Sequence, residues 1–140
     1  MTYTIARDTN VVSVIVTDIV TLQDCIRSVD GLLAEAVLRP GMQLLVDATN
    51  LKPELSFDDL RNLVGHVERL VRRGLDSIAI IATSDLVFGL ARTFSAYGDI
   101  HGFNVAAFRT PERALTWLEA SRAASHAQIR NTAISKREMQ

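Results

Sequence analysis

The sequence has little of the material from which disulfide-bonded, metal-binding or covalent catalytic proteins are built. Its 140 residues include one cysteine, three prolines, three histidines and 6% aromatic residues. A single cysteine, Cys25, excludes an internal disulfide. The histidines are far apart and show no His-x-x-x-His spacing, and no second cysteine or convergent carboxylates accompany them. We therefore expect no metal site.

Charge of one sign is also lacking, because 15 basic residues stand against 16 acidic ones, for a net charge of -1 at pH 7. Binding of nucleic acid or anionic membrane through bulk charge is thus not expected. No apolar run is long enough to span a membrane, and no charged-then-apolar leader is present, so the sequence predicts a cytoplasmic location. There is no Gly-x-Gly-x-x-Gly motif and no P-loop, and we expect no cofactor.

What the sequence does contain is a core: 48% of its residues are apolar and 22% are charged. That composition and length predict one globular domain, with no Gly/Ser-rich or Pro-rich linker. Cys25 recurs with Leu22, Ile26 and Val29 on one face of a helical pattern. This position favours a packing role for the thiol over a reactive one.

Short apolar and β-branched runs predict five strands, at residues 3–6, 11–17, 43–47, 78–83 and 104–108. Amphipathic stretches predict four helices, from Thr21 to about Val37, from Ser56 to Gly74, from Ser84 or Asp85 to about Tyr97, and after Thr110. The pairs Thr21/Asp24 and Ser56/Asp59 are typical of capped helix starts. The segment 48–54, which contains Pro53, is predicted to be a loop.

The spacing of these elements predicts an α/β fold of order ββαβαβαβα. The first two strands are four residues apart, as in an antiparallel hairpin. The later strands alternate with helices, which indicates parallel pairing through right-handed crossovers. The prediction is one domain with a mixed sheet of about five strands, the first antiparallel and the later ones parallel, packed with about four helices.

The runs Ser77–Thr83, Ser84–Phe94 and Phe108–Leu118 resemble the SpoIIAA-like branch of the STAS superfamily. The resemblance covers about residues 1–120, leaving 121–140 as a basic C-terminal tail. It implies the same ββαβαβαβα order and a domain that regulates, or binds a ligand or partner, rather than one that catalyses.

One family feature is missing. The phosphorylated members, the anti-sigma-factor antagonists, carry an Asp-Ser-Ser-Gly motif at the start of the helix after the third strand, where this sequence reads Leu-Lys-Pro-Glu-Leu-Ser-Phe-Asp-Asp-Leu over residues 51–60. The phosphoserine switch is therefore not carried over. Ser56 is better explained as a helix cap, because Asp58 and Asp59 beside it would repel an added phosphate.

Candidate ligand-binding residues follow two predicted strands, where parallel sheets usually bind ligands. They are Asp47, Thr49 and Asn50 after one strand, and Ser84 and Asp85 after the next. The alternative is that Asp47 and Asn50 form a turn and that Ser84 or Asp85 caps a helix. The sequence leaves both interpretations open.

A candidate contact surface comes from helical geometry. Leu86, Leu90, Phe94 and Tyr97 share one face, which we expect to pack on the sheet. The other side presents Phe88, Arg92, Ser95 and Asp99. An aromatic residue four positions before an arginine predicts a surface for a partner or second subunit. The alternative is an arginine packed over the ring, or a phenylalanine covered by a loop or the tail.

The tail at 121–140 holds four basic residues and one acidic residue, and the preceding 120 residues carry a net charge of -4. We expect it to continue the last helix and to dock on protein, for instance on a second copy in a homodimer. The chain as a whole is predicted to be a non-enzymatic STAS-like regulatory or ligand-binding module for a small or apolar ligand or a protein partner. The alternatives are a small enzyme using Asp47 with Thr49 or Ser84, and a receiver-like phospho-switch at Asp47, although Asp18 stands alone where such a switch needs an acidic pair.

Overall fold

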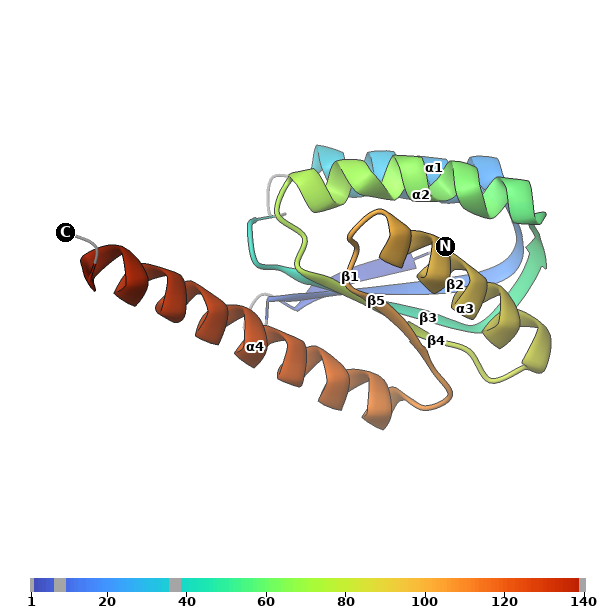
Figure 1. The fold of residues 1–140 in the computed structure, drawn as a ribbon. Coiled ribbons are helices and arrows are strands. Elements are labelled where there is room, and N and C mark those ends of the chain that lie inside the picture. Colours follow the sequence, from blue (N-terminus) through green and yellow to red (C-terminus); the bar gives the residue numbers. More distant parts are fainter. Residues whose placement is uncertain (1, 7–9, 36–38, 139–140) are drawn as a thin grey trace.

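Strands and helices alternate along the chain from the second strand onward (Figure 1). The computed structural model describes residues 2–6, 10–35 and 39–138. Its elements are β1 (Thr2–Ala6), β2 (Val11–Thr21), α1 (Leu22–Ala34), β3 (Gln43–Glu54), α2 (Phe57–Arg72), β4 (Ser77–Ile81), α3 (Asp85–Ile100), β5 (Val105–Phe108) and α4 (Pro111–Glu138).

The strands lie in the sheet in the same order as in the chain, β1-β2-β3-β4-β5. β2 to β5 are parallel, and β1 pairs antiparallel with β2, with Tyr3 opposite Val14. The structure confirms a single α/β domain in which four parallel strands alternate with four helices.

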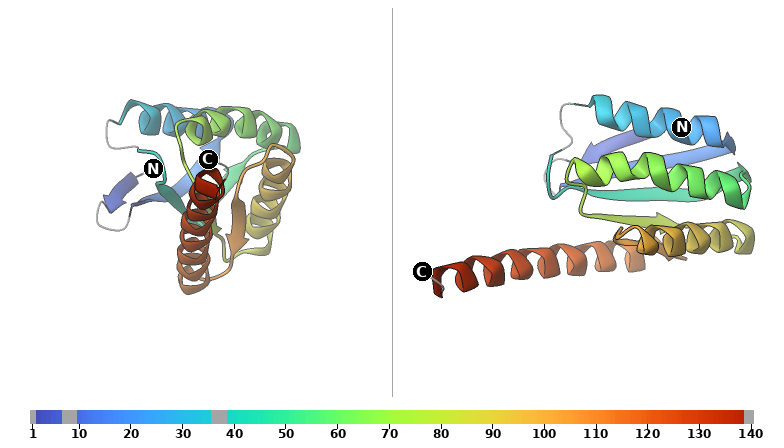
Figure 2. Two further views of the ribbon diagram at one scale, coloured as in Figure 1. Left: turned by 60° about the vertical axis from the view of Figure 1, so that its left-hand side comes forward. Right: turned by 45° about the horizontal axis from the view of Figure 1, so that its top comes forward.

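The helices are distributed unequally over the two faces of the sheet. Each crossover from β2 to β5 steps in the same direction, and right-handed crossovers of that kind place their helices on one side. α1, α2 and α3 accordingly lie together on one face, which we call the front face (Figure 2). α4 follows the last strand and packs on the opposite face, the back face.

The main core lies between the front face and the three helices. Strand alternation supplies Val12, Val14 and Val16 from β2, and these meet the apolar faces of the helices, including Val29, Leu32, Val64, Val67, Leu70 and Phe94. A smaller cluster on the back face joins Ala114 and Leu118 of α4 to Ala79 and Ile81 of β4.

Two helix starts have the predicted caps. The Thr21 hydroxyl accepts from the Asp24 N–H at 3.3 Å, and the Asp24 carboxylate accepts from the Thr21 N–H at 3.0 Å. Ser56 and Asp59 form the same reciprocal pair at the start of α2. The end predicted for the first helix, near Val37, lies outside the described residues.

The predicted loop at 48–54 is wrong, because β3 continues to Glu54. Beyond Asp47, β3 pairs only with the extended end of β2, from Asn50 opposite Thr17 to Glu54 opposite Thr21. A bulge separates the two paired segments, and Asp18 adopts a φ of 66° close to it. Pro53 is tolerated because β3 has become an edge strand at this point.

Candidate functional site

An apolar cavity of about 170 Å³ lies between the front face and the three helices that cover it. The sheet contributes side chains such as Val14, Val46 and Ile80 to its wall. The helices contribute others, such as Val29, Val67 and Leu90. Most of these residues also belong to the main core or pack against it, so the cavity is a gap within the core.

The two polar side chains in the wall bring no charge to the cavity. The Ser28 hydroxyl donates to the Asp24 carbonyl at 2.9 Å, which satisfies it within α1. Burial, together with the nearby carboxylates of Asp24 and Asp59, raises the pKa of the Cys25 thiol to about 11. The thiol is therefore neutral at physiological pH, and the wall offers apolar contact rather than acid-base or nucleophilic chemistry.

A gap of this size is costly if it stays empty. Closed core cavities destabilise a fold by about 24 cal/mol per Å³, so about 4 kcal/mol is the upper limit for this volume, because the cavity is partly open to solvent. Protein interiors are otherwise packed with few voids larger than a water molecule. An occupant that makes apolar contacts would recover part of this energy.

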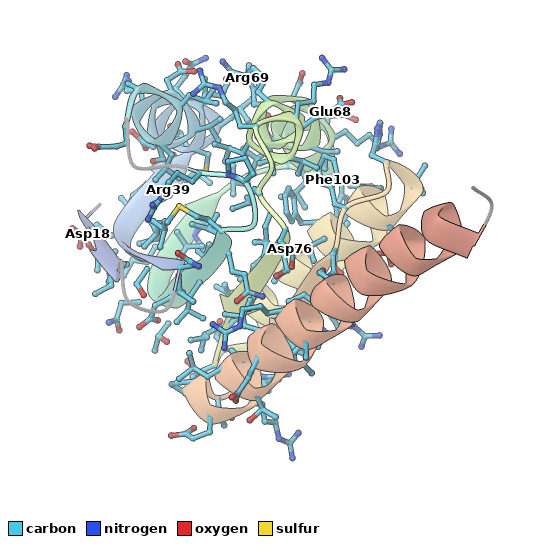
Figure 3. All side chains as sticks on the ribbon, turned by 90° about the vertical axis from the view of Figure 1, so that its left-hand side faces the viewer. Asp18, Arg39, Glu68, Arg69, Asp76 and Phe103 are labelled. Carbon is cyan, nitrogen blue, oxygen red and sulfur yellow. The ribbon has the colours of Figure 1, made fainter. Side chains whose placement is uncertain are left out.

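The helices over the cavity are joined at their outer surface. The Arg69 guanidinium of α2 contacts the Asp30 carboxylate of α1 at 2.8 Å, and Arg73 donates to the Leu33 carbonyl at 3.3 Å. Figure 3 shows Arg69 at the junction of these two helices. The Arg61 guanidinium of α2 lies 5.4 Å from the ring centre of Tyr97 in α3. Helices α1, α2 and α3, which we call the roof helices, are thus joined by exposed polar contacts above a core that is incompletely filled.

Two large apolar side chains are exposed where α2 and α3 begin. Phe57 is 62% exposed at the first position of α2, and Leu86 is 66% exposed in the first turn of α3. Leu55, two residues before Phe57, and Val87, next to Leu86, line the cavity. Helices that follow parallel strands begin at the same edge of the sheet, so both side chains mark the end of the domain at which the cavity approaches the surface.

The predicted packing of Leu86 on the sheet is therefore wrong. The buried positions of α3 are Val87, Ala91, Phe94 and Gly98, a stripe displaced by one residue at the start of the helix. Leu90 and Tyr97 pack half-buried against the core beside this stripe. The Leu86 side chain, in the first turn of α3, is therefore left in solvent.

The predicted strand-end residues lie at one edge of the sheet, with partners within the chain. The Asp47 carboxylate accepts from the Thr49 N–H at 3.0 Å, as in a turn, and the Ser84 hydroxyl accepts from the Val87 N–H at 3.2 Å, as in a helix cap. Asp85 pairs with Arg109 at 2.9 Å. Asn50 is an exposed residue of β3 opposite Thr17.

Asp47 is also separated from the cavity by the alternation of its strand. Its neighbours Val46 and Ala48 line the cavity on the front face. Because side chains alternate along a strand, Asp47 points to the back face, as do Gln43 and Leu45, which meet α4 there. A ligand-binding role for these polar residues stays a prediction.

The residues of the predicted contact surface point in different directions. The Phe88 ring packs beside Ala48 and Ala82, and the guanidinium 4.1 Å above it belongs to Arg109 rather than Arg92. Ser95 donates to the Val105 carbonyl at 2.7 Å, facing β5. Arg92 and Asp99 are exposed. Sequence reasoning missed Arg109, which follows β5 and meets α3 only through the fold.

In the part of the chain that the structure describes, no three or more His, Cys, Asp or Glu side chains are grouped in a way that could hold a metal ion. Within the same residues, no helix has both the length and the apolar character needed to cross a membrane.

Comparison with known proteins identifies the fold. No family model matches the chain, and no curated protein has a similar sequence. A crystal structure from Shewanella loihica PV-4, an uncharacterized protein of the DUF3478 family with a SpoIIAA-like fold, is similar to it with a TM-score of 0.50 and 20% sequence identity. The match covers 77% of this chain and 82% of the other. The chain thus has a SpoIIAA-like fold, as its sequence predicts.

Proposed function

We propose that the chain is a non-enzymatic module that binds a small, uncharged, apolar ligand between the front face of its sheet and helices α1 to α3. The observation that carries this proposal is the apolar cavity of about 170 Å³. Three crossover helices cover it, and its lining side chains lack the charged groups that acid-base catalysis or a charged ligand would require.

The size of the cavity limits the ligand. An engineered cavity of about 150 Å³ with similar aliphatic walls stays dry and binds benzene. A single ring, or a chain of about six carbons, is therefore the class of group expected inside. A carboxylate or phosphate attached to such a group would have to remain outside the cavity, because burying an unpaired charge is strongly unfavourable.

The exposed side chains of Phe57 and Leu86 support entry at the start of α2 and α3. An apolar ligand leaving water would meet these side chains before it reached the wall of the cavity. Binding would then bring the roof helices into tighter contact with the sheet, and that change is how a module of this kind could signal its occupancy to a partner.

Thermal unfolding in the presence of toluene tests the proposal. A ligand that binds only the folded state raises the melting temperature, and the increase grows with the logarithm of the ligand concentration above its dissociation constant. We expect toluene to stabilise the wild-type protein and to lose this effect in Ala91→Leu, which places a larger side chain into the cavity from α3. Ala96→Leu is the matched control, because Ala96 lies on the exposed side of the same helix.

Two results would contradict the proposal. One is a melting temperature that does not respond to toluene or to a series of cyclic and linear hydrocarbons. The other is an equal response in wild type and Ala91→Leu. Native mass spectrometry of the gently purified chain, which detects small molecules that co-purify and are released on denaturation, would then identify the natural occupant.

A further inference from the structure

The back face of the sheet is wider than the single helix that packs on it. Adjacent strands are about 4.8 Å apart, so five strands span about 20 Å, whereas a helix is about 10 Å across. In the described residues, α4 packs on β4 and β5 and also reaches the first residues of β2 and β3, where Val11, Gln43 and Leu45 meet it. The rest of this face, over β2 and β3 beyond these residues, is the uncovered half, and it has room for one more helix.

Two isoleucines of β2 mark this uncovered half. Val14 and Val16 are buried on the front, so Ile15 points to the back, where it is 45% exposed. Val20 lines the front cavity, so its neighbour Ile19 also points to the back, and it is 59% exposed. Both belong to the same strand, which places them along one line that a helix could follow.

The chain also has a helix segment that extends beyond its own domain. α4 has 28 residues, which corresponds to about 42 Å. It is anchored as far as Ser125, whose hydroxyl donates to the Asp76 carboxylate at 2.6 Å, and Figure 3 shows Asp76 beside this helix. From there its backbone continues past the ends of the strands to Glu138, as the right view of Figure 2 shows.

We propose that this C-terminal half of α4 lies on the uncovered half of the back face of a second copy, in a symmetric dimer. Within one chain, α4 is a continuous helix that runs past the N-terminal ends of the strands, whereas Ile15 and Ile19 lie farther along β2, so its own end does not reach that surface. In a dimer, each copy would supply one helix to the other and receive one in return.

Charge supports this choice of partner. The last 20 residues carry four basic residues and one acidic residue, whereas residues 1–120 have a net charge of -4. On the uncovered half itself, Asp47 follows Leu45 and the exposed Lys52 lies opposite Ile19, so these two charges offset each other. The attraction is therefore between the basic helix segment and the net negative charge of residues 1–120, and a second copy of this chain carries such a segment. The inference does not depend on the proposed ligand.

Size-exclusion chromatography with light scattering on the full chain tests the dimer. We expect wild type to have twice the 15.4 kDa mass of one chain across the micromolar range. Ile15→Lys should be monomeric, because it places a charge on the uncovered face opposite a basic helix. Ile100→Lys is the control and should remain dimeric, since Ile100 is 80% exposed but lies at the end of α3.

A second variant tests the helix without altering the sheet. Ala133→Pro interrupts α4 beyond Ser125, so it should also give a monomer whose melting curve at low concentration matches that of Ile15→Lys. A monomeric wild type at all concentrations overturns the proposal, as does a dimer that persists in both Ile15→Lys and Ala133→Pro.

Discussion

Two glycines of α3 show how strongly a single methyl group depends on its surroundings. A Cβ on Gly98 would lie 2.7 Å from Val105 Cγ1 and 3.3 Å from Phe103 Cβ, whereas a Cβ on Gly89 would have no atom within 4 Å. Gly98 is therefore the position at which α3 approaches β5 and the turn before it. Gly89 has no such packing role, although both glycines lie in the same helix.

Alanine at these two positions should have opposite effects on stability. Gly98→Ala should lower the free energy of unfolding by about 1–3 kcal/mol through overpacking, less what alanine gains in helix propensity. Gly89→Ala should raise it by about 0.5–1 kcal/mol, because glycine is the poorer helix former. Urea denaturation of both variants measures the difference, and equal shifts would show that α3 does not pack on β5 as closely as described.

At the scale of the elements, the start of α1 depends on an ionised carboxylate. Hydrogen bonds from the backbone N–H and the hydroxyl of Thr21 lower the pKa of Asp24, and the nearby Arg27 lowers it further. A carboxyl group whose pKa is lowered by folding stabilises the folded state above its ordinary pKa of about 3.9. That contribution is lost as the pH falls through the lower, folded-state pKa.

Asp24→Asn should therefore change the pH dependence of stability as well as its level. Urea denaturation at neutral pH should show wild type to be more stable than the variant. The difference in free energy of unfolding between the two proteins should become smaller as the pH falls below about 4 and Asp24 becomes protonated. If the two proteins lose stability in parallel over that range, the capping box does not rest on the Asp24 charge.

The elements also show where sequence patterns stop being sufficient. Helix starts are local, and the pairs Thr21/Asp24 and Ser56/Asp59 could be recognised from spacing alone. The continuation of β3 to Glu54 could not, because it depends on the end of β2 extending alongside it across a bulge. Pro53 indicates a loop in isolation, yet an edge strand accepts it.

The same limit applied to α3 and to the candidate site. Helical spacing correctly predicted that Phe94 is buried, but it wrongly predicted the same for Leu86. In the first turn of a helix, spacing alone does not decide which of two adjacent apolar residues points toward the core. The cavity had no sequence signal at all. Its lining residues, such as Val46 and Leu90, could be predicted to be buried, but whether they fill the space between them depends on how three helices settle on the sheet.

For the whole molecule, the cavity should make the fold sensitive to pressure. Pressure favours the state of smaller volume, and the volume decrease on unfolding grows with the internal void that unfolding eliminates. Ala91→Leu should therefore unfold at higher pressure than wild type, with a smaller volume change, as followed by tryptophan fluorescence of Trp117. Ala96→Leu should keep the wild-type volume change, and an equal change in both variants would indicate that the void does not contribute.

The strand order β1-β2-β3-β4-β5 also bears on how the chain reaches its fold. Each parallel pairing joins strands separated by only one helix, as in Val11 with Gln43 and Ile78 with Val105, so no pairing has to close a loop that spans the whole chain. No strand has to insert between two that are already paired. The sheet could therefore grow from its N-terminal edge as the polypeptide leaves the ribosome, with the long final helix added last.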